Sequence, residues 1–472
     1  MIYGLVDFGS TFTKLALVDG GTGALLGTSQ HPTTIDTDVF EGYDAALSAA
    51  LESAGVSGVD RVLAASSAAG GLRMIAVGLV DDLTASAAKR AALSAGAKVE
   101  GVWSGTLGED AARQIRAGAP DVILFAGGTD GGDRERVLHN ARRLARAGTG
   151  SAVVVACNRD VADQVAAVFE RSDHHTTVVD NVLPRIDVEN AGPAREVIRE
   201  LFIERVVRAK GLSTTSAFFE SVVMPTPAAV LACAELIAEP PEGLAGAGSA
   251  VIVDVGGATT DLHSVLAPGP PRRRTSRVGP APARSGRTVE GDLGVRWNAD
   301  VVYAQDQRWM SDYIGLADAE ILRAVEDRKK TPSYIPGSAE QARIDRALAA
   351  SCIAKGMERH VGRLSTRYVP GDGADVVLTG RDLRESRVVL VTGGSVVRDE
   401  HAGAAVVQTA IERLDQNRPA PRSAVLLIDH HYVLAAAGLL ATLDPVAAHR
   451  LLTTHVPGLA DGLSQQPAST HS

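Results

Sequence analysis

The chain begins with short apolar runs separated by polar turns, a pattern that is typical of β-strands. The runs that predict strands in this first part are residues 2–7, 14–19, 24–28 and 61–66. A glycine-rich cluster at 19–23 predicts a hairpin turn between two of them. Apolar residues at three- and four-residue spacing over 38–54 predict a helix.

Between residues 73 and 180 the pattern changes to strands that alternate with helices. Strands are predicted at 74–80, 122–125, 153–156 and 177–179, and helices at 84–95, 134–147 and 161–171. This alternation is typical of a parallel sheet flanked by helices, so we predict an α/β subdomain over 73–180. Further helices are predicted at 193–210, 228–238, 343–364 and 432–440.

A second β-rich section opens with the apolar run 251–254 and has later strands at 388–391 and 425–428. Within it, residues 268–286 are rich in Pro, Arg, Gly and Ser, which predicts a solvated, flexible loop. An arginine-lined partner contact is the weaker alternative for this loop. The polar residues 461–472 predict a disordered tail.

Composition and charge exclude several classes of function. The chain has 472 residues, 45% of them hydrophobic, which is too apolar for a disordered protein and enough for more than one core. It carries 47 basic and 56 acidic residues, a formal net charge of −9. Non-specific binding to nucleic acid or to an anionic membrane needs surplus Lys and Arg, so we predict neither partner.

Cysteine use and the absence of targeting segments indicate a compartment. Cys157, Cys233 and Cys352 are too few and too far apart for a disulfide framework or a CxxC metal site, which favours a reducing cytoplasm. No basic segment followed by an apolar one begins the chain, so we expect no signal peptide. The apolar stretch 424–441 contains one Asp and two His residues, which makes it a poor membrane span.

Among the 48 glycines, three clusters follow directly after apolar strands. They are VDFGSTFTK at 6–14, VDVGGATTD at 253–261 and VTGGS at 391–395. In the first two, an Asp ends the strand and hydroxyl residues follow the glycine. Glycine lets backbone N–H groups approach an anion closely, and an adjacent Asp can hold Mg²⁺ through water.

Each of these turns alone is a weak signal, because a strand that ends in Asp-x-Gly is often only a hairpin. The matched pair at Asp7 and Asp254 is a stronger signal and suggests two similar half-domains that contact a phosphate chain and its Mg²⁺ from two sides. The sequence has no GxxxxGK[ST] motif, and no GxGxxG follows a strand. Neither the P-loop nor the dinucleotide fingerprint therefore explains the glycines.

These motifs resemble those of the actin, heat-shock chaperone and sugar kinase (ASKHA) ATPase superfamily. DFGSTFTK resembles its phosphate 1 motif, DVGGATTD its phosphate 2 motif and VTGGSVVR its adenosine motif. Over nearly the whole chain, a closer resemblance is to the glutamate mutase L-type (MutL) family, accessory proteins of adenosylcobalamin-dependent mutases. The segments that carry it are ASSAAGGLRM, ILFAGGTDGG, DNVLP, RTVEGDLGVR and IDHHYVLAAAGLL.

The resemblance implies an α/β fold with two actin-like, ribonuclease H-like half-domains around a nucleotide cleft, plus an inserted α/β subdomain. We place the first half-domain at 1–72 plus 181–247, and the inserted subdomain at 73–180. The second half-domain then covers 248–460.

The resemblance also implies which residues bind ATP. Asp7 and Asp254 would hold Mg²⁺ through water, and Asp254 would orient the attacking water with Asp261 as a substitute. The residues expected to contact the nucleotide are Gly9, Ser10, Thr11, Phe12, Thr13, Lys14, Gly256, Gly257, Ala258, Thr259, Glu290, Asp292, Gly393, Gly394 and Ser395.

Two of these assignments have an alternative that the residues leave open. Lys14 would neutralise phosphate charge or be an ordinary surface or salt-bridged lysine. Glu290 and Asp292 are expected to open a helical stretch, where they would bind the ribose or cap the helix.

The implied function is that of a cytoplasmic ATP-binding and ATP-hydrolysing protein that assists or reactivates an adenosylcobalamin-dependent mutase, such as glutamate mutase or an aminomutase. Its cofactors would be ATP and Mg²⁺, and its partners the mutase subunits. Because no Asp-x-His-x-x-Gly pattern is present, we predict no direct cobalamin ligand. A small-molecule kinase of the same superfamily and a nucleotide-sensing assembly scaffold with little turnover are the alternatives.

Two further features have both a functional and a plain interpretation. AGGTDGG at 126–132 would bind an anion at a helix N-terminus, or it is an ordinary strand-to-helix turn in a subdomain that could imitate a cobalamin-binding domain. The pairs His174-His175 and His430-His431 suggest metal binding. Adjacent strand residues point to opposite faces, so we favour packing or surface roles for both pairs.

Overall fold

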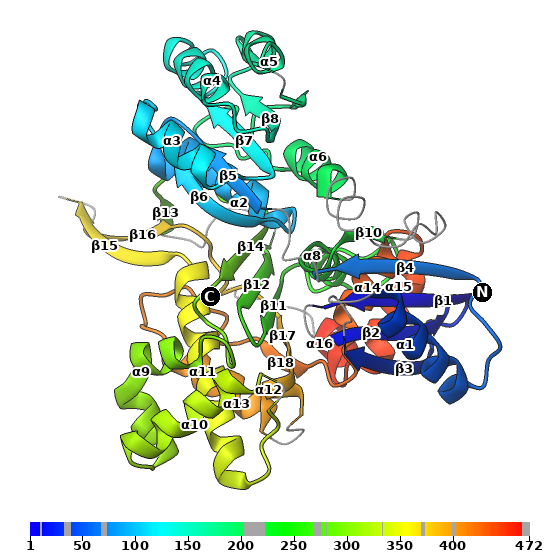
Figure 1. Cartoon of the computed structure of the whole chain (residues 1–472). Helices are drawn as coiled ribbons and strands as arrows, with labels where there is room; N and C mark the ends of the chain where they lie inside the picture. The colour runs from blue at the N-terminus through cyan, green and yellow to red at the C-terminus, as the bar shows by residue number, and fades with distance from the viewer. Residues whose placement is uncertain are drawn as a thin grey trace. The chain divides into compact units, whose positions relative to one another are not determined.

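The computed structural model describes residues 1–9, 12–32, 39–67, 73–172, 174–202, 222–267, 275–279, 281–332, 334–369, 373–398 and 402–464 (Figure 1). The chain divides into two compact units. The first contains Met1–Asp19, Leu25–Ala229 and Val278–Gly286, and the second contains Gly20–Ala24, Val230–Arg277 and Arg287–Ser472.

One sheet of the first unit has five strands in the order β10-β4-β1-β2-β3. Its strands are β1 (Ile2–Phe8), β2 (Phe12–Asp19), β3 (Leu25–Pro32), β4 (Arg61–Ser66) and β10 (Val222–Pro225). β2 is antiparallel to both β1 and β3, whereas β4 is parallel to β1 and to β10. Helix α1 (Val39–Ala54) buries Tyr43, Ala46 and Ala50 against apolar residues of β1 and β2. Helix α8 (Thr226–Ala238) follows β10.

The main sheet of the second unit repeats this arrangement with the order β14-β12-β11-β17-β18. Its strands are β11 (Ala250–Val255), β12 (Thr260–Val265), β14 (Ser285–Glu290), β17 (Val388–Thr392) and β18 (Val425–Ile428). β12 is antiparallel to β11, whereas β17 is parallel to both β11 and β18. When the strands of each sheet are numbered in chain order, both sheets have the spatial order 3-2-1-4-5.

Helices cover the second unit's sheet and form its largest core. Val251, Val253 and Val255 of β11 pack against α11, whose buried residues from Ile344 to Met357 are mostly apolar. The helices of this unit are α9 (Ala299–Ile314), α10 (Asp318–Lys330), α11 (Ala339–His360), α12 (Gly394–Val397), α13 (Gly403–Glu412), α14 (Leu434–Ala441), α15 (Pro445–His455) and α16 (Leu459–Ser464). A separate three-stranded sheet contains β13 (Thr275–Arg277), β15 (Arg363–Val369) and β16 (Gly373–Thr379).

A third five-stranded sheet, of order β6-β5-β7-β8-β9, is parallel throughout. It contains β5 (Arg73–Val77), β6 (Lys98–Trp103), β7 (Val122–Gly127), β8 (Ala152–Cys157) and β9 (Thr176–Val178). Apolar residues of β5, β7 and β8 alternate between two cores, one on each face. Helices α2 (Ser86–Ser94) and α6 (Gly192–Phe202) cover one face, and α3 (Glu109–Ala117), α4 (Glu135–Ala147) and α5 (Ala162–Glu170) cover the other (Figure 1). A π-helical turn, η1 (Asp81–Ala85), precedes α2.

The predicted fold class is confirmed. The chain is α/β, with two sheets of one ribonuclease H-like strand order and an additional parallel sheet with helices on both faces. Because α6 contributes Ala194, Ile198 and Phe202 to the core of the parallel sheet, that core continues beyond residue 180. No helix in the described ranges is long and apolar enough to cross a membrane.

Some local predictions were wrong. Part of the loop predicted at 268–286 forms strands, because β13 pairs with β16 and β14 pairs with β12. The predicted tail begins inside a helix, α16, which buries Leu459 and Leu463. The strands β6, β15 and β16 and the helices α3, α9 and α10 were missed.

Candidate functional site

The first predicted turn is a tight hairpin between β1 and β2. The N–H of Gly9 donates to the carbonyl oxygen of Phe12 at 3.0 Å. A Cβ atom at Gly9 would lie 2.6 Å from that same oxygen, so the turn has no room for a side chain there. Ser10 and Thr11, which were predicted to contact phosphate, lie outside the described residues.

Asp7, the penultimate residue of β1, lies beside this turn and has partners on β2 and directly after β10. It lies directly across from Lys14 of β2 in the antiparallel register. Thr226 is the residue that follows β10, and its hydroxyl donates a hydrogen bond to Asp7 Oδ1 at 2.5 Å. Burial raises the pKa of Asp7 above its ordinary value of 3.8, although the Lys14 charge and the Thr226 hydrogen bond oppose that shift. The structure thus brings Asp7, Gly9 and Lys14 together at one end of the first sheet.

The second predicted turn repeats this backbone geometry between β11 and β12. The N–H of Gly256 donates to the carbonyl oxygen of Thr259 at 2.8 Å, and a Cβ at Gly256 would lie 2.8 Å from that oxygen. Asp254 stands two residues before the glycine, as Asp7 does in the first turn. Its antiparallel partner on β12 is Asp261 rather than a lysine.

Residues 296–298 hold the second turn in place through hydrogen bonds to its carbonyl oxygens. The backbone N–H groups of Arg296 and Trp297 both donate to the Gly257 carbonyl at 2.9 Å, and Asn298 Nδ2 donates to the Ala258 carbonyl at 2.7 Å. These hydrogen bonds occupy the Gly257 and Ala258 carbonyl oxygens, which would repel an anion. The turn is therefore rigidly placed, which is the condition for an amide-lined anion site.

Asp261 has a buried ionic partner. Arg287 of β14 approaches Asp261 Oδ1 with Nε at 2.9 Å and Nη2 at 2.5 Å, and both side chains are largely buried. The Thr259 hydroxyl also donates to Asp261 Oδ2, at 3.3 Å. Because an arginine already engages Asp261, its suggested role as a substitute for Asp254 stays a prediction without support from these contacts.

The third predicted turn lies directly beside the second. Asp254 of β11 pairs with Thr392 of β17 in the parallel register, and Gly393 follows at once. Gly393 has φ +110°, and a Cβ there would lie 2.2 Å from the Val255 carbonyl oxygen, so only glycine fits. Among the described residues, none is a hydrogen-bond partner of the buried Ser395 Oγ. The structure therefore brings Asp254 together with Gly393, Gly394 and Ser395.

Two residues that follow β18, Asp429 and Tyr432, lie beside this group and were not among the predicted site residues. Asp429 is almost fully buried, and its carboxylate accepts hydrogen bonds from the N–H groups of Val433, at 2.8 Å, and Leu434, at 3.2 Å. Tyr432 has its hydroxyl oxygen 3.6 Å from where a Cβ at Gly394 would lie. The helix predicted from 432 begins at Leu434, so Tyr432 stands in the turn before it. The apolar pattern of 432–440 hid this turn.

The prediction that Glu290 and Asp292 open a helix was wrong. Glu290 is the last residue of β14, and the next helix begins at Ala299. Arg359 binds both acids, with Nη1 at 2.7 Å from Glu290 Oε2 and 2.6 Å from Asp292 Oδ1. Hydrogen bonding to Arg359 is the main cause that lowers the pKa of Asp292 to about 2. The ribose role of these acids stays a prediction.

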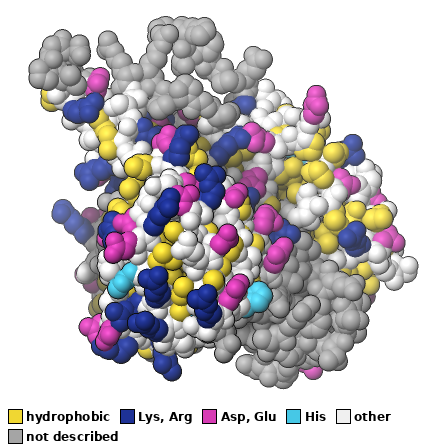
Figure 2. Space-filling model, turned by 90° about the horizontal axis from the view of Figure 1, so that it is seen from above, with side chains coloured by type: hydrophobic (Ala, Val, Ile, Leu, Met, Phe, Trp, Pro, Cys, Tyr) yellow, Lys and Arg dark blue, Asp and Glu magenta, His cyan; other side chains and the backbone are white. Residues whose placement is uncertain are grey.

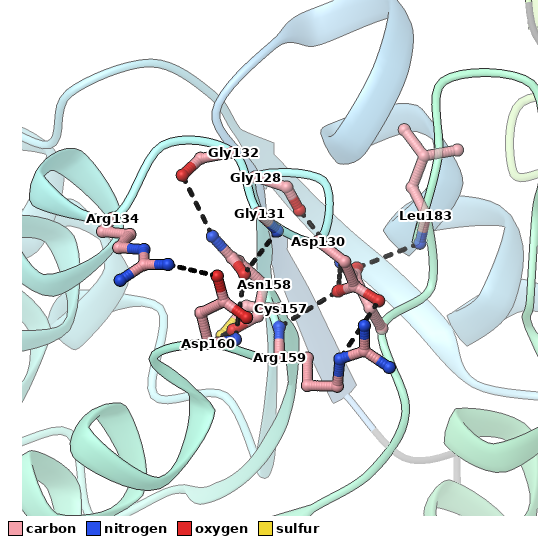
Figure 3. Close-up of polar contacts among 11 residues, drawn as sticks. Gly128, Asp130, Gly131, Gly132, Arg134, Cys157, Asn158, Arg159, Asp160 and Leu183 are labelled. Atoms are coloured by element: carbon pink, nitrogen blue, oxygen red, sulfur yellow. Dashed lines mark hydrogen bonds and ion pairs between the residues drawn. The ribbon is translucent and has the colours of Figure 1, made fainter.

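The AGGTDGG segment forms the loop between β7 and α4, shown in Figure 3. Two asparagines from neighbouring strands hold it in place. Asn181 Nδ2 donates to the Gly128 carbonyl at 3.0 Å and to Asp130 Oδ1 at 2.9 Å. Asn158 accepts from the Gly131 N–H at 3.3 Å and donates to the Gly132 carbonyl at 3.2 Å.

The start of α4 already has an acidic cap. Asp133 Oδ1 accepts from the Arg136 N–H at 2.9 Å, so a bound anion would meet a carboxylate there. These contacts favour an ordinary, asparagine-braced strand-to-helix turn over an anion site.

Acidic and basic side chains are interspersed with apolar ones on the face drawn in Figure 2.

The histidine pairs have packing contacts rather than metal-like ones. His174 Nδ1 lies 2.9 Å from the Ser151 carbonyl, and its ring packs edge-on against Phe169. His430 Nδ1 lies 3.2 Å from the Val397 carbonyl. Within the described ranges, no group of three or more His, Cys, Asp or Glu residues could hold a metal ion.

Comparison with known proteins adds a family match. The sequence profile of the MutL protein family matches residues 3–456. Protein MutL of Clostridium tetanomorphum is 39% identical over 458 residues, which cover 96% of this chain and 99% of that protein.

Among solved structures, a ROK family glucokinase from Streptomyces griseus in complex with glucose and AMPPNP is 12% identical, with a TM-score of 0.34 over 93% of this chain and 98% of that one. The activator of the 2-hydroxyisocaproyl-CoA dehydratase from Clostridium difficile, with bound ADPNP, is 8% identical, with a TM-score of 0.31 over 96% of this chain and 97% of that one. Both structural likenesses are too distant to carry a functional argument.

Proposed function

The chain belongs to the MutL protein family, and from this premise we propose that it binds ATP with Mg²⁺, hydrolyses it and serves as an accessory or reactivating protein for an adenosylcobalamin-dependent mutase of the glutamate mutase kind. The observation that carries the proposal is the repeated hairpin at Gly9 and Gly256. Two sheets of the same strand order each place an Asp-x-Gly turn at the same strand end, with the same hydrogen bond across the turn.

The residues of the second unit fit a nucleoside triphosphate. Gly256 and Gly393 allow tight backbone turns at which a Cβ atom would meet a carbonyl oxygen, and the buried Ser395 hydroxyl, which has no hydrogen-bond partner among the described residues, can bind a ligand oxygen. In the proposal, backbone N–H groups of the Gly256–Thr259 turn bind phosphate oxygens, and the Gly393–Ser395 turn admits the adenosine and α-phosphate.

We propose that Mg²⁺, which keeps most of its water and needs few protein ligands, is held through water by a strand-end carboxylate, Asp254 in the second unit or its counterpart Asp7 in the first. When bound, Mg²⁺ would neutralise charge on the transferred phosphoryl group. Asp254 would orient the attacking water. Positioning and charge neutralisation are the main demands of phosphoryl transfer, and these groups meet them.

The accessory role follows from family membership rather than from a contact in the chain. We propose that ATP turnover changes the conformation of the protein and that the mutase responds by releasing damaged cobalamin or by being protected from damage. Because no cobalamin-ligand motif is present, the proposal assigns cobalamin itself to the mutase.

The test measures phosphate release by the purified chain, with and without glutamate mutase loaded with adenosylcobalamin. We expect release from the parent, stimulation by the mutase, and a loss of roughly a hundredfold or more in Asp254→Ala. Asp187→Ala, which removes an exposed surface carboxylate, is the matched control and should behave as the parent.

Each other outcome points elsewhere. Equal rates for Asp254→Ala and the parent would contradict the site assignment. A phosphorylated product from a metabolite panel would favour a small-molecule kinase. A stable complex with the mutase and no phosphate release would favour a nucleotide-sensing scaffold, and the absence of any complex would leave the partner proposal wrong.

A further inference from the structure

The backbone at Tyr432 adopts a conformation that costs energy. Its φ is +54°, in the left-handed region, and Ala119 is the only other non-glycine residue with positive φ in the described ranges. A bulky side chain in this region is strained. Such strain persists only where the surroundings enforce it, and it is concentrated at functional sites.

The residues around Tyr432 enforce this conformation. The Asp429 carbonyl accepts from the Tyr432 N–H at 3.2 Å, and the Asp429 carboxylate fixes the next two backbone N–H groups. Asp429 is itself anchored to the sheet, since its N–H donates to the Val391 carbonyl at 3.0 Å. The turn is therefore locked between β18 and α14.

The consequence of this turn is the position of the phenol. The Tyr432 hydroxyl lies beside Gly394, in the turn that follows β17 and next to the end of β11. β11, β17 and β18 are mutually parallel neighbours, and ligands of α/β sheets bind outside the carboxyl ends of such strands. The buried Ser395 hydroxyl, which has no hydrogen-bond partner in the described part of the chain, stands in the same turn.

Burial is the main reason that the Tyr432 hydroxyl stays a neutral donor. Burial raises its pKa above 10.0; Arg398 opposes this shift, and the Asp429 and Asp254 carboxylates add to it. At physiological pH the group therefore carries its proton. A neutral O–H donor beside a glycine turn suits an anionic oxygen, because hydrogen bonds to charged acceptors are the stronger ones.

We propose that Tyr432 is a nucleotide-binding residue, whose hydroxyl donates a hydrogen bond to a phosphate oxygen of the nucleotide at the Gly393–Ser395 turn. This inference rests on the proposed function, since it needs a nucleotide in the second unit. It adds a residue that the glycine motifs do not contain.

The test compares Tyr432→Phe with the parent by calorimetric titration with AMPPNP and with adenosine. The substitution keeps the ring and removes only the hydroxyl. We expect AMPPNP affinity to fall roughly tenfold, as for the loss of one hydrogen bond to a charged group, with adenosine affinity unchanged. Tyr368→Phe, which removes a hydroxyl from a tyrosine that is 80% exposed, is the matched control and should bind as the parent.

The outcomes separate this inference from the proposed function. If the parent binds neither ligand, the proposed function is wrong. If the parent binds AMPPNP and Tyr432→Phe binds it equally well, the inference is wrong. An equal loss for adenosine, or a large fall in the ligand-free thermal midpoint, would overturn the phosphate contact and show that the hydroxyl supports only the fold.

Discussion

The hairpin after β1 and the hairpin after β11 share a backbone but differ in their charged side chains. In both, a glycine N–H donates to the carbonyl three residues on, and a fully buried threonine, Thr13 or Thr260, stands four residues after the glycine in the next strand. The strand-end Asp7 faces Lys14, whereas Asp254 faces Asp261. Backbone geometry has thus been kept while the electrostatic environment of the carboxylate has changed.

The difference shows how each sheet tolerates a carboxylate at this position. In the first sheet, a lysine on the neighbouring strand and a threonine hydroxyl compensate Asp7. In the second, two carboxylates stand directly opposite each other, which is destabilising unless a cation intervenes. Arg287, from the third strand, supplies that cation to Asp261.

Removal of Arg287, which binds Asp261 in the second sheet, should have the largest effect on stability. Arg287→Met should lower the free energy of unfolding by roughly 3–5 kcal/mol, because it leaves Asp261 buried and without its arginine. Urea denaturation measures the change. Arg185→Met, at an exposed pair with Asp187, is the control and should change little.

The same experiment has an internal check on its cause. Adding Asp261→Asn to Arg287→Met removes the buried charge, so the double variant should recover part of the lost stability. A cost of less than about 1 kcal/mol for Arg287→Met alone would show that the pair is not needed for folding.

Substituting the two turn glycines tests the shared backbone. Gly9→Ala and Gly256→Ala each force a methyl group against a carbonyl oxygen, at 2.6 Å and 2.8 Å, and each should cost roughly 1–3 kcal/mol. Gly337→Ala, at a position with open space, serves as the control. Thermal denaturation should give similar losses for the two turns, and a loss in only one would contradict their equivalence.

A smaller effect distinguishes the carboxylates by pH. Because the folded-state pKa of Asp7 is raised, the stability that this group contributes is present below its unfolded pKa and lost as pH rises through the folded pKa. Asp7→Asn should therefore be more stable than the parent at pH 7, with a difference that shrinks toward acid pH. Denaturant midpoints from pH 3 to 7 measure it.

Asp292 provides the opposite sign as a reference. Its pKa is lowered to about 2, so its contribution is present above its unfolded pKa and lost as pH falls through the folded value. Asp292→Asn should be slightly less stable than the parent at pH 7, and the difference should disappear as pH falls below about 2. A gain in stability for both variants at pH 7 would contradict the assigned causes.

The sequence predicted best where local pattern and local chemistry agree. The strand at 61–66 was predicted with its observed bounds, since it is a short apolar run. The glycine turns could be predicted because a backbone carbonyl lies where a side chain would be, so the turn needs a glycine that the sequence shows. β6 was missed because its residues, KVEGVW, are exposed or half-buried throughout, and its position depends on hydrogen bonds to β5.

The partners of the site residues could not be predicted, because they come from distant parts of the chain. Thr226 reaches Asp7 across 219 positions, and Arg359 reaches Glu290 across 69. Tyr432 was placed in a helix because its neighbours are apolar. Only the locked turn at Asp429 shows that it precedes the helix.

The parallel sheet β5–β9 has its own place in the chain: with helices on both faces, it is encoded between Arg73 and Phe202. The strands β4 and β10 on either side of it belong to a different sheet and pair with one another. Two junctions in a gene would therefore be enough to install or delete it without reordering any other strand. The surface of the β5–β9 sheet and its helices can accordingly evolve toward a new partner, while the sheet that contains β4 and β10 keeps its glycine turn.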